Sequence, residues 1–298
     1  MKKRKIKVWK TAFILVLLLC ALWLSSVWVR IYERSPQPDG ARGETLRGVT
    51  NIMILGLDQE DDEPSRADTI IVMSINNISH DVALVSIPRD SRVEIVGLGL
   101  DKINHAMQFG GVPLLQETVE TLLDIPIHHY LYTNFSGFES MVDAVGGIEM
   151  QVERDIIGLD GHPIVEEGPQ HLDGSQALSY ARFRSDPEGD FGRMRRQQQV
   201  LKAIVAQLIQ IKSVVRMPML LEQFARHIRT DMTLPTLLRF SRTSASLDFE
   251  NVPTIQLQGR VATIEGISYV LLDQDFLQET VRHYIRWENP TSTNFIAI

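Results

Sequence analysis

Arginines gather in four short stretches of this chain, at residues 66–69, 86–90, 180–184 and 190–197, and aspartates accompany them in all but the third. An arginine guanidinium stays protonated and presents a rigid fork of donors that matches the oxygens of a phosphate group. Aspartates beside such arginines are hard oxygen ligands for Mg2+, which phosphate sites commonly recruit. These residue types therefore predict a diphosphate site that includes Mg2+.

Asp58, Arg66 and Asp68 stand around the ends of two expected strands. Asp58 follows an apolar run at 51–57, and Arg66 and Asp68 are two residues apart where the next run begins. Side chains at strand ends are held by the sheet and face an open loop, which is common for binding sites. On a strand, Arg66 and Asp68 share one face. A surface ion pair, worth less than about 1 kcal/mol, explains these two residues equally well.

The next arginines occur at a turn and at a helix end. Arg89 follows a proline that ends strand pairing, and by itself this indicates only a turn. Arg182 and Arg184 share a face if the helix before them gives way to extended chain at residue 183. Two like charges this close repel each other unless an anion or carboxylates lie between them. A salt-bridge network could supply those carboxylates from three residues: Asp186, Glu188 and Asp190.

A helix expected at 193–212 carries both polar and apolar candidates. Arg193, Arg196 and Gln197 fall on neighbouring faces of its first turn, where the positive end of the helix dipole favours a bound anion. Apolar residues then form one broad face at 200–209. Such a face is more often ordinary hydrophobic core than a ligand-binding surface.

Other kinds of chemistry have little support. The eight histidines show neither an HExxH motif nor a paired metal-binding spacing, and the chain contains no GxSxG, Walker A or GxGxxG motif. The sequence therefore disfavours a serine nucleophile, a P-loop and a dinucleotide site.

The N-terminus predicts a membrane anchor. Residues 1–10 are a basic tail, and the apolar run at 11–29 is about 28 Å long as a helix, enough to cross the hydrocarbon core of a bilayer. Residues 11–30 favour an uncleaved signal anchor over a cleaved signal peptide, because the run is long and lacks a clear cleavage site. The positive-inside rule places the tail in the cytoplasm and the C-terminal domain outside the cell, as in a single-pass type II protein of the cell membrane.

The formal net charge of −7 is unevenly distributed. Residues 1–30 hold seven Lys and Arg and no Asp or Glu, so the remainder carries 23 basic and 37 acidic residues, a net charge of −14. An exported domain this acidic is a poor binder of nucleic acid, and a local arginine cluster must hold any anion it takes. The single cysteine, Cys20, lies in the apolar run, so the exported part has no internal disulfide.

A linker rich in proline, glycine and charged residues is expected at 31–48, before a folded domain at 49–298. Hydrophobic periodicity predicts strands at 51–57, 69–75, 81–87, 130–134 and 148–152, the second and third joined as a hairpin. Helices are predicted at 113–124, 173–182, 193–212, 218–229 and 234–244. The predicted fold class is α/β, a single mixed β-sheet flanked by helices and preceded by one transmembrane helix.

The ordered motifs of residues 50–210 resemble the LytR-CpsA-Psr family of cell-wall polymer transferases. Besides the charged stretches, the resemblance is carried by residues 51–58 (NIMILGLD), 102–104 (KIN), 110–111 (GG), 142–147 (VDAVGG) and 172–178 (LDGSQAL). The departures are small: His105 and Met107 stand where small or aromatic residues are more usual.

The resemblance implies an α/β/α fold with an apolar pocket for a polyprenyl chain. It implies an enzyme of the membrane surface that moves an anionic glycopolymer, such as teichoic acid or capsule, from a polyprenyl diphosphate carrier to a peptidoglycan hydroxyl, forming a phosphodiester. By matching positions, Asp58 and Asp68 would hold Mg2+, and Asp190 would lie nearest the reacting phosphorus. The diphosphate would be clamped by Arg66, Arg89, Lys102, Arg182, Arg184, Arg193, Arg196 and Gln197. The lipid would contact Val200, Ile204 and Leu208.

Two alternatives differ from this transfer reaction. The first is still catalytic, the hydrolysis of polyprenyl diphosphate to the monophosphate. The second is attenuation of transcription without catalysis, as the historical naming of the family suggests. Direct DNA binding would need a basic cytoplasmic domain, and only ten residues precede the predicted membrane segment.

Overall fold

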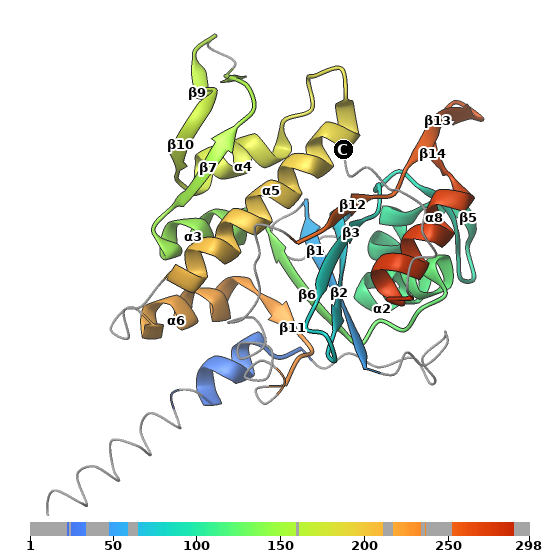
Figure 1. The fold of residues 1–298 in the computed structure, drawn as a ribbon, viewed down its shortest axis with the longest axis horizontal. Helices are drawn as coiled ribbons and strands as arrows, with labels where there is room; N and C mark the ends of the chain where they lie inside the picture. The colour runs from blue at the N-terminus through green and yellow to red at the C-terminus, as the bar shows by residue number, and fades with distance from the viewer. Residues whose placement is uncertain are drawn as a thin grey trace, which may run out of the picture.

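A six-stranded mixed sheet forms the centre of the molecule (Figure 1). The computed structural model describes residues 23, 25–33, 48–58, 65–158, 161–210, 217–233, 236 and 252–288. The strand order is β11-β6-β1-β2-β3-β12. These strands are β1 (Val49–Leu57), β2 (Ala67–Asn76), β3 (Val82–Ser86), β6 (His129–Asn134), β11 (Arg229–Thr230) and β12 (Thr254–Gln256). β1 pairs in parallel with β6 and antiparallel with β2, and β3 pairs antiparallel with β2 and in parallel with β12.

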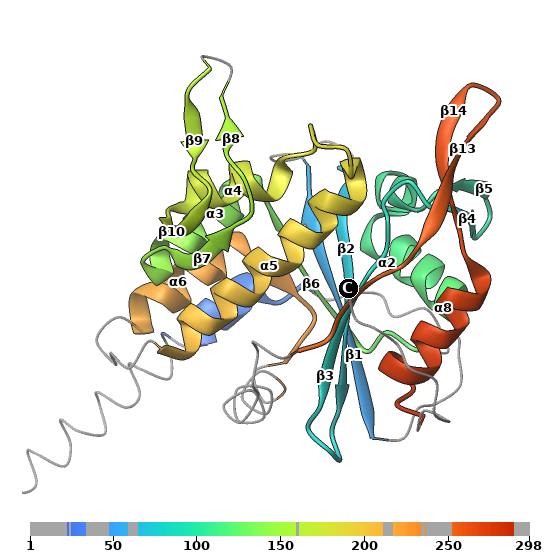
Figure 2. The same ribbon diagram turned by 45° about the horizontal axis from the view of Figure 1, so that its top comes forward.

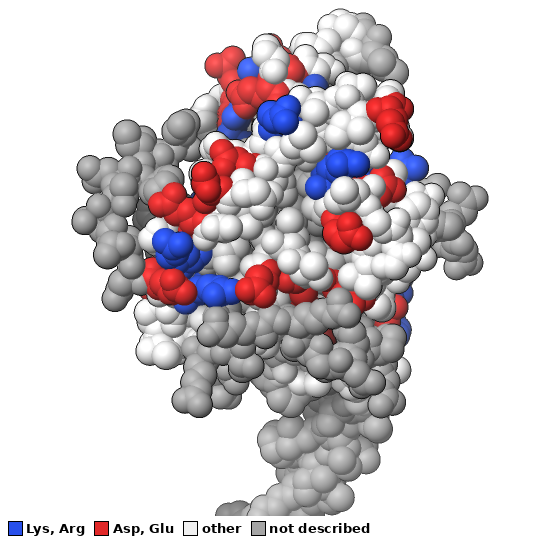
Figure 3. All heavy atoms as spheres, turned by 90° about the vertical axis from the view of Figure 1, so that its right-hand side faces the viewer, with Lys and Arg blue, Asp and Glu red and all other residues white. Residues whose placement is uncertain are grey.

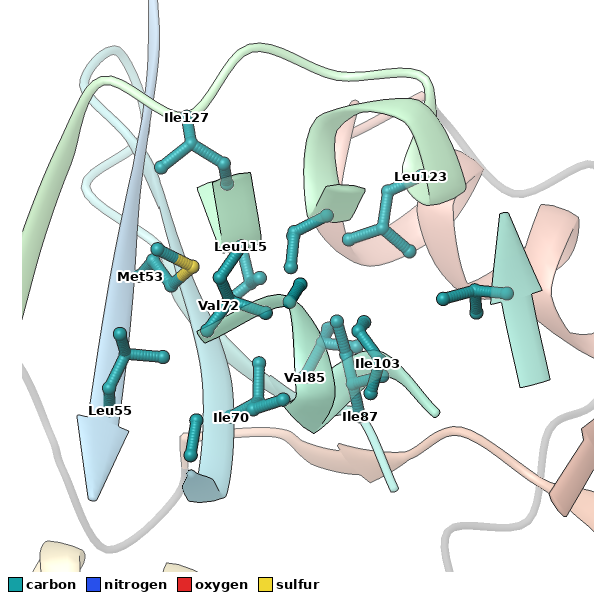
Figure 4. Close-up of a cluster of buried hydrophobic side chains, with 14 of the residues drawn as sticks. Met53, Leu55, Ile70, Val72, Val85, Ile87, Ile103, Leu115, Leu123 and Ile127 are labelled. Carbon is teal, nitrogen blue, oxygen red and sulfur yellow. The ribbon is translucent and has the colours of Figure 1, made fainter. Parts of the chain in front are cut away.

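One face of the sheet is covered by α2 (Ile103–Leu123), α8 (Gln274–Thr280) and the π-helical turn η2 (Val281–Ile285). Side chains on a strand alternate between its two faces, so every second residue of β1 and β2 points to this side. Figure 4 shows Met53 and Leu55 turned toward the side chains of α2. Burial of these apolar side chains is the main stabilising contribution of the layer.

The opposite side of the sheet carries the other helices, α3 (Phe135–Val145), α4 (Gly174–Arg182), α5 (Gly189–Gln210) and α6 (Met217–His227), as Figure 2 shows. These four helices pack on one another around a second apolar cluster. The predicted central mixed sheet flanked by helices is confirmed.

The predicted hairpin is confirmed as β2 and β3. Its turn follows from the chemistry of Asn76, whose side-chain oxygen accepts hydrogen bonds from the backbone N of Ile78 at 2.9 Å and of Ser79 at 3.2 Å. An asparagine that satisfies the two following backbone donors favours a turn over further extension.

Two helices differ from their predicted limits. α2 begins at Ile103 instead of residue 113, and it bends at Gly111, where φ is 65° and ψ is −160°. Glycine tolerates this positive φ angle, so the helix continues beyond Gly110 and Gly111. By sequence, this glycine pair indicates a break in the helix. α3 was not predicted. It starts where the Asn134 side chain accepts a hydrogen bond from Gly137 N at 2.9 Å, which satisfies one of the free donors of the first turn.

The remaining predicted helices have clear counterparts. The helix at 173–182 is α4, whose Asp173 and Gln176 form a capping box. The helices at 193–212 and 218–229 are α5 and α6, and the first starts four residues earlier than predicted, at Gly189. The helix predicted at 234–244 lies outside the described residues, apart from residue 236.

Four two-stranded sheets stand beside the central one, whereas the sequence predicted a single sheet. The strand predicted at 148–152 is present as β7 (Ile148–Val152), but it pairs with β10 (Gly168–Leu172). The other pairs are β4 (Arg92–Ile95) with β5 (Gly99–Lys102), β8 (Ile156–Ile157) with β9 (Pro163–Val165), and β13 (Gly259–Ile264) with β14 (Ile267–Leu272). The three hairpins β4–β5, β8–β9 and β13–β14 were not predicted from the hydrophobic pattern.

Most of the predicted anchor, residues 11–22 and 24, lies outside the described residues, as do residues 34–47 of the predicted linker. Within the part of the chain that the structure describes, no helix is both long and apolar enough to span a bilayer. Residues 25–31 are helical and dock on the domain. Arg30 contacts Glu222 of α6 through two nitrogens, at 2.6 and 3.0 Å, and Glu33 N donates to Thr230 O at 2.9 Å. Residues 31–33 of the predicted linker therefore belong to a segment that contacts the domain.

The face that carries α8 and the β13–β14 hairpin mixes both signs of charge around a broad uncharged area (Figure 3). Over the described residues of this face, basic side chains form no continuous field. That distribution is unlike the basic surface with which proteins hold nucleic acid.

Candidate functional site

The topology of the sheet brings the charged strand ends to one edge. β1, β3 and β6 run in the same direction, and antiparallel β2 begins where they end. Asp58 follows β1, Asp68 is the second residue of β2, and Arg89 follows β3. The first turn of α5 reaches the same edge, since Asp190 Oδ1 lies 3.8 Å from Arg89 Nε. In open α/β sheets, ligands bind beyond the C-terminal ends of the strands.

Arg89 is at the centre of this edge and faces three carboxylates. Its Nη1 donates to Asp68 Oδ1 at 2.6 Å. Its Nε lies 3.7 Å from Asp90 Oδ2 and 3.8 Å from Asp190 Oδ1. The three carboxylates come from β2, from the loop after β3 and from α5, so this one guanidinium links three separate elements.

Two further cations complete the group. Lys102 Nζ lies 2.7 Å from Asp90 Oδ1, and Arg193 Nη2 forms an ion pair with Asp190. Lys102 ends β5 and Arg193 stands in the first turn of α5, so the group draws on residues that are far apart in the sequence. We refer to the six connected side chains as the charge cluster: Asp68, Arg89, Asp90, Lys102, Asp190 and Arg193.

The charge cluster contains hydrogen-bond donors that the protein does not satisfy. The Nε atoms of Arg89 and Arg193 are buried and have no hydrogen-bond acceptor among the described residues. The side chains that carry them are only 18% and 5% exposed. Because buried donors are nearly always paired in native proteins, donors left over beside a group of charges indicate a place for a ligand oxygen.

The pKa values in the charge cluster reflect burial opposed by ion pairing. Burial raises the pKa of Asp190, and the positive charges of Arg193 and Arg89 only partly offset this increase. Burial lowers the pKa of Arg193, and Asp190 opposes that change. For Arg89, burial acts downward but the hydrogen bond and charge of Asp68 prevail, so its pKa is raised. The arginines stay charged, while Asp190 accepts a proton more readily than an ordinary aspartate.

Arg182 and Arg184 are both exposed, and neither has a carboxylate partner within the described ranges. The guanidinium carbon of Arg182 lies 4.3 Å from the ring centroid of Phe135, at the end of β6. The positive charge of Arg184 helps to lower the pKa of Arg193, so Arg184 lies near the charge cluster. The two side chains therefore add positive charge to the same edge of the sheet.

The salt-bridge network that the sequence left open as an alternative for Arg182 and Arg184 forms instead with the arginines of α5. Each of the three candidate carboxylates has a partner on that helix: Asp186 with Arg196, Glu188 with Arg195, and Asp190 with Arg193. The turn before α5 folds the acidic residues back over the helix start, which the sequence pattern did not indicate. The structure therefore leaves Arg182 and Arg184 to other partners.

Arg196 lies apart from the charge cluster and is fully buried. Its Nη1 donates to Asp186 Oδ2 at 2.7 Å and its Nη2 to Phe183 O at 2.7 Å, and neither side chain of the ion pair has exposed surface. Its Nε also lacks an acceptor among the described residues, but two of its other nitrogens are already paired within the protein. This geometry ties the 183–186 turn to α5, so it favours a structural role over the predicted contact with substrate. Gln197, its neighbour, is half-buried.

Asp58 and Arg66 lie at the same edge and interact locally. Asp58 Oδ1 accepts a hydrogen bond from Arg66 N at 2.8 Å, and Arg66 Nε donates to Gln108 Oε1 of α2 at 3.0 Å. Arg66 and Asp68 do not form the surface ion pair that the sequence left open, because Asp68 is bound to Arg89 instead. Gln108 had no role in the sequence analysis, and no signal in the sequence pointed to it.

The apolar residues predicted to contact lipid are on the side of α5 that faces α3, α4 and α6. Val200 is 1% exposed within the apolar cluster of those helices, and Ile204 and Leu208 are half-buried against it. The ordinary-core interpretation therefore fits Val200 in this conformation. The other two have surface left to meet a further apolar group.

Asp58 and Asp68 have the chemistry to share a Mg2+ ion with a ligand. Within the described ranges, no group of three or more His, Cys, Asp or Glu side chains gathers in a way that could hold a metal by itself. Mg2+ in phosphate sites commonly takes one or two carboxylates and completes its shell with water and substrate phosphates. Two carboxylates at one sheet edge fit that donor set, provided that the ligand supplies further oxygens.

Comparison with known proteins identifies the family of the chain. The LytR_cpsA_psr family profile matches residues 32–285. A protein of Halalkalibacterium halodurans named polyisoprenyl-teichoic acid–peptidoglycan teichoic acid transferase TagU is 36% identical over 247 residues, 82% of this chain and 80% of the relative.

Two solved structures of TagT with bound ligands share the fold. A further structure of TagT, from B. subtilis, shares it too. TagT bound to LIIa-WTA has a TM-score of 0.70 and 29% identity, covering 85% of this chain and 96% of that one. TagT with bound octaprenyl pyrophosphate lipid has a TM-score of 0.68 and 28% identity, covering 85% and 99%. The match of the family profile over most of the chain, together with a relative above one-third identity, shows that the chain belongs to the LytR_cpsA_psr family.

Proposed function

We propose that this protein is a membrane-anchored phosphotransferase. It moves an anionic glycopolymer, of which teichoic acid is the best supported, from a polyprenyl diphosphate carrier to a hydroxyl group of peptidoglycan and leaves a phosphodiester. The name of the TagU relative supports the polymer and the acceptor, and the octaprenyl pyrophosphate in TagT supports the carrier. The observation that carries the proposal is the charge cluster, with buried guanidinium donors that have no acceptor among the described residues.

The charge balance of the site suits a diphosphate. In the charge cluster three cations face three carboxylates, and Arg182 and Arg184 add two exposed positive charges beside it. A diphosphate diester spreads its negative charge over several oxygens, so several rigid guanidinium groups bind it better than one lysine would. Arg89 and Arg193 occupy the buried part, and Arg182 and Arg184 the solvent side.

The transfer step requires one bond to form and one to break. The acceptor hydroxyl oxygen attacks the phosphorus that carries the polymer, and the bond from this phosphorus to the bridging diphosphate oxygen breaks. Polyprenyl monophosphate leaves with the electron pair of that bond. The hydroxyl proton goes to Asp190, whose raised pKa makes its carboxylate a better acceptor near neutral pH. Arg89 and Arg193 stabilise the charge that builds up on the phosphoryl oxygens.

Asp58 and Asp68 would hold Mg2+ beside the diphosphate. When bound, the ion would neutralise charge on the phosphate oxygens. Asp68 also holds Arg89 at 2.6 Å, so this carboxylate orients the arginine whether or not a metal is present.

We further propose that residues 11–30 anchor the protein in the cell membrane, with residues 1–10 in the cytoplasm and the domain outside the cell. The length of the apolar run and its basic flank support this topology. An anchored enzyme shares the bilayer with its lipid substrate. The exposed parts of Ile204 and Leu208 would receive the polyprenyl chain near the membrane surface.

Product analysis tests the proposal against hydrolysis of the carrier. The purified full-length protein is incubated in liposomes with polyprenyl-diphosphate-linked polymer, with and without peptidoglycan. Transfer predicts polymer bound to peptidoglycan and polyprenyl monophosphate, both only when the acceptor is present. Equal release of monophosphate without acceptor would instead establish a pyrophosphatase. No turnover in either reaction would contradict both activities.

A further inference from the structure

The hairpin β13–β14 lies outside the motifs of residues 50–210, yet it joins the loop that carries Arg89. Val270 N of β14 donates to Asp90 O at 2.8 Å, and Ser91 and Val270 form a parallel bridge. Asp90 is the carboxylate that holds Lys102. The C-terminal hairpin thus forms part of the support of the charge cluster.

Tyr269, the residue before Val270, contacts the cations of the neighbouring hairpin. Its ring centroid lies 5.8 Å from Lys102 Nζ and 5.6 Å from the guanidinium carbon of Arg92. Arg92 and Lys102 are directly opposite each other in the pairing of β4 with β5. Like charges in that position repel, whereas the electron-rich face of an aromatic ring attracts both of them.

The Tyr269 side chain is buried, and its surroundings fix the orientation of the ring. Only 7% of the residue is exposed, and its hydroxyl lies 3.5 Å from Asp101 Oδ1. Asp101 is held in turn by His105 Nδ1, 2.8 Å from Asp101 Oδ2, and by the backbone N of Lys102, which donates to Oδ1 at 2.7 Å. The ring is therefore fixed against the same short segment that presents the lysine.

We propose that Tyr269 is a positioning residue that holds the Lys102 ammonium against Asp90 so that it can meet the diphosphate. This inference rests on the proposed transferase function and assigns a role to the C-terminal hairpin in it. Without the ring, the ion pair with Asp90 is the one remaining described contact of the ammonium that opposes the repulsion from Arg92, and the flexible lysine stem can turn toward solvent. The lysine stem is long and freely rotating, so its position depends on such neighbours.

Kinetics of three variants measure the effect on substrate binding. Tyr269→Leu keeps an apolar side chain but removes the ring, and we expect KM for the lipid-linked donor to rise about tenfold with kcat changed much less, within the range of cation–π contacts. Tyr269→Phe keeps the ring and should behave as the wild type. Tyr284→Leu removes a half-buried tyrosine of η2 that packs on the apolar core, and it serves as the matched control.

Chemical labelling of Lys102 tests the positioning without relying on catalysis. Acetylation of the full-length protein with an N-hydroxysuccinimide ester, followed by mass spectrometry, reports the accessibility of each lysine amine. We expect Lys102 to react severalfold faster in Tyr269→Leu than in the wild type, Tyr269→Phe or Tyr284→Leu. Unchanged reactivity of Lys102 in Tyr269→Leu, or an equal increase in Tyr284→Leu, would overturn the inference.

The two measurements separate the failure of this inference from failure of the proposed function. If the wild type performs no transfer but Lys102 still becomes reactive in Tyr269→Leu, the proposed function fails and the positioning role stands. If the wild type transfers polymer and Tyr269→Leu keeps its KM, the function stands and the inference fails. In Lys102→Met, the further change Tyr269→Leu should leave KM unchanged, and an additional tenfold rise would overturn the inference.

Discussion

Arg193 and Arg196 lie three residues apart on α5, and they reach two very different surroundings. Arg193 shares its partner Asp190 with Arg89, and that carboxylate is 24% exposed. Arg196 has a carboxylate of its own, Asp186, and both side chains are completely covered. The residue type is the same in both places. What differs is that Asp190 serves two arginines and keeps contact with solvent, whereas Asp186 serves one arginine and is fully covered.

The paired aspartates show the same contrast in their pKa values. For Asp190, burial prevails over two arginines and its pKa is raised. For Asp186, burial also acts upward, but the hydrogen bond and charge of Arg196 prevail and its pKa is lowered. A carboxylate with a complete set of partners remains charged and stabilises the fold, and one that is only partly compensated can take part in proton transfer.

The largest effect is expected at the buried pair. Arg196→Met leaves Asp186 charged without a partner, and removal of one member of a buried ion pair costs about 3–5 kcal/mol. Urea denaturation of the full-length protein should show this loss in the free energy of unfolding. Adding Asp186→Leu should restore much of it. If Arg196→Met were as stable as the wild type, Arg196 would not have the structural role that distinguishes it from Arg193.

Loss of Arg89 should affect activity and leave the fold intact. Removal of one preorganised donor to a developing charge lowers kcat about 100- to 1000-fold. Transfer by Arg89→Ala should fall in this range, and its free energy of unfolding should fall less than that of Arg196→Met, because Asp68, Asp90 and Asp190 keep contact with solvent. Arg282→Ala, at an arginine of η2 whose side chain is 58% exposed, is the matched control and should keep full activity. If both variants were equally active, the charge cluster would have no part in transfer.

The pH dependence of transfer should show the raised pKa of Asp190. Transfer needs the ionised carboxylate, so activity should fall as pH decreases through that pKa, above the value of about 4 for an ordinary aspartate. Arg193→Gln removes the main charge that lowers the pKa of Asp190, so the acidic decline of its residual activity should shift to higher pH. A shift to lower pH, or no shift, would exclude Asp190 as the group that is titrated.

The smallest effect is expected at an exposed ion pair, which extends the comparison to a third environment. Arg30 and Glu222 make two close contacts, but the arginine side chain is 45% exposed. Solvent screens such a pair, so Arg30→Gln should leave the thermal unfolding midpoint almost unchanged. A decrease as large as that of Arg196→Met would show that docking of residues 25–33 contributes as much to stability as the buried pair.

The sequence predicted much of the central sheet, because long apolar runs with β-branched residues have few alternatives to buried strands. It also placed Asp68 and Arg89 correctly at strand ends. It could not indicate that Asp186 belongs to Arg196 and not to Arg182 or Arg184, because that choice depends on how the turn before α5 folds back. Partner choice among nearby charges is a tertiary property, and spacing alone does not determine it.

Other features were beyond sequence reasoning for the same reason. The bend at Gly111 lets α2 start at Ile103, although a glycine pair followed by Pro113 indicates a helix start after the break. The role of Tyr269 depends on a contact between two hairpins, in which its ring centroid lies 5.8 Å from Lys102 Nζ. No strand was predicted at β4 or β14, although the strands β6 and β7, of similar length, were predicted.

The most direct test of the central claim follows the phosphorus atom that carries the polymer. A donor labelled at that phosphorus is incubated with peptidoglycan and either the wild type or Arg193→Ala, and the thermal unfolding of both proteins is measured alongside. We expect the label to enter peptidoglycan as a phosphodiester with the wild type, and at least about 100-fold more slowly with a variant that still unfolds cooperatively above the assay temperature. Label that never enters peptidoglycan with the wild type, or that enters equally fast with Arg193→Ala, would contradict the account.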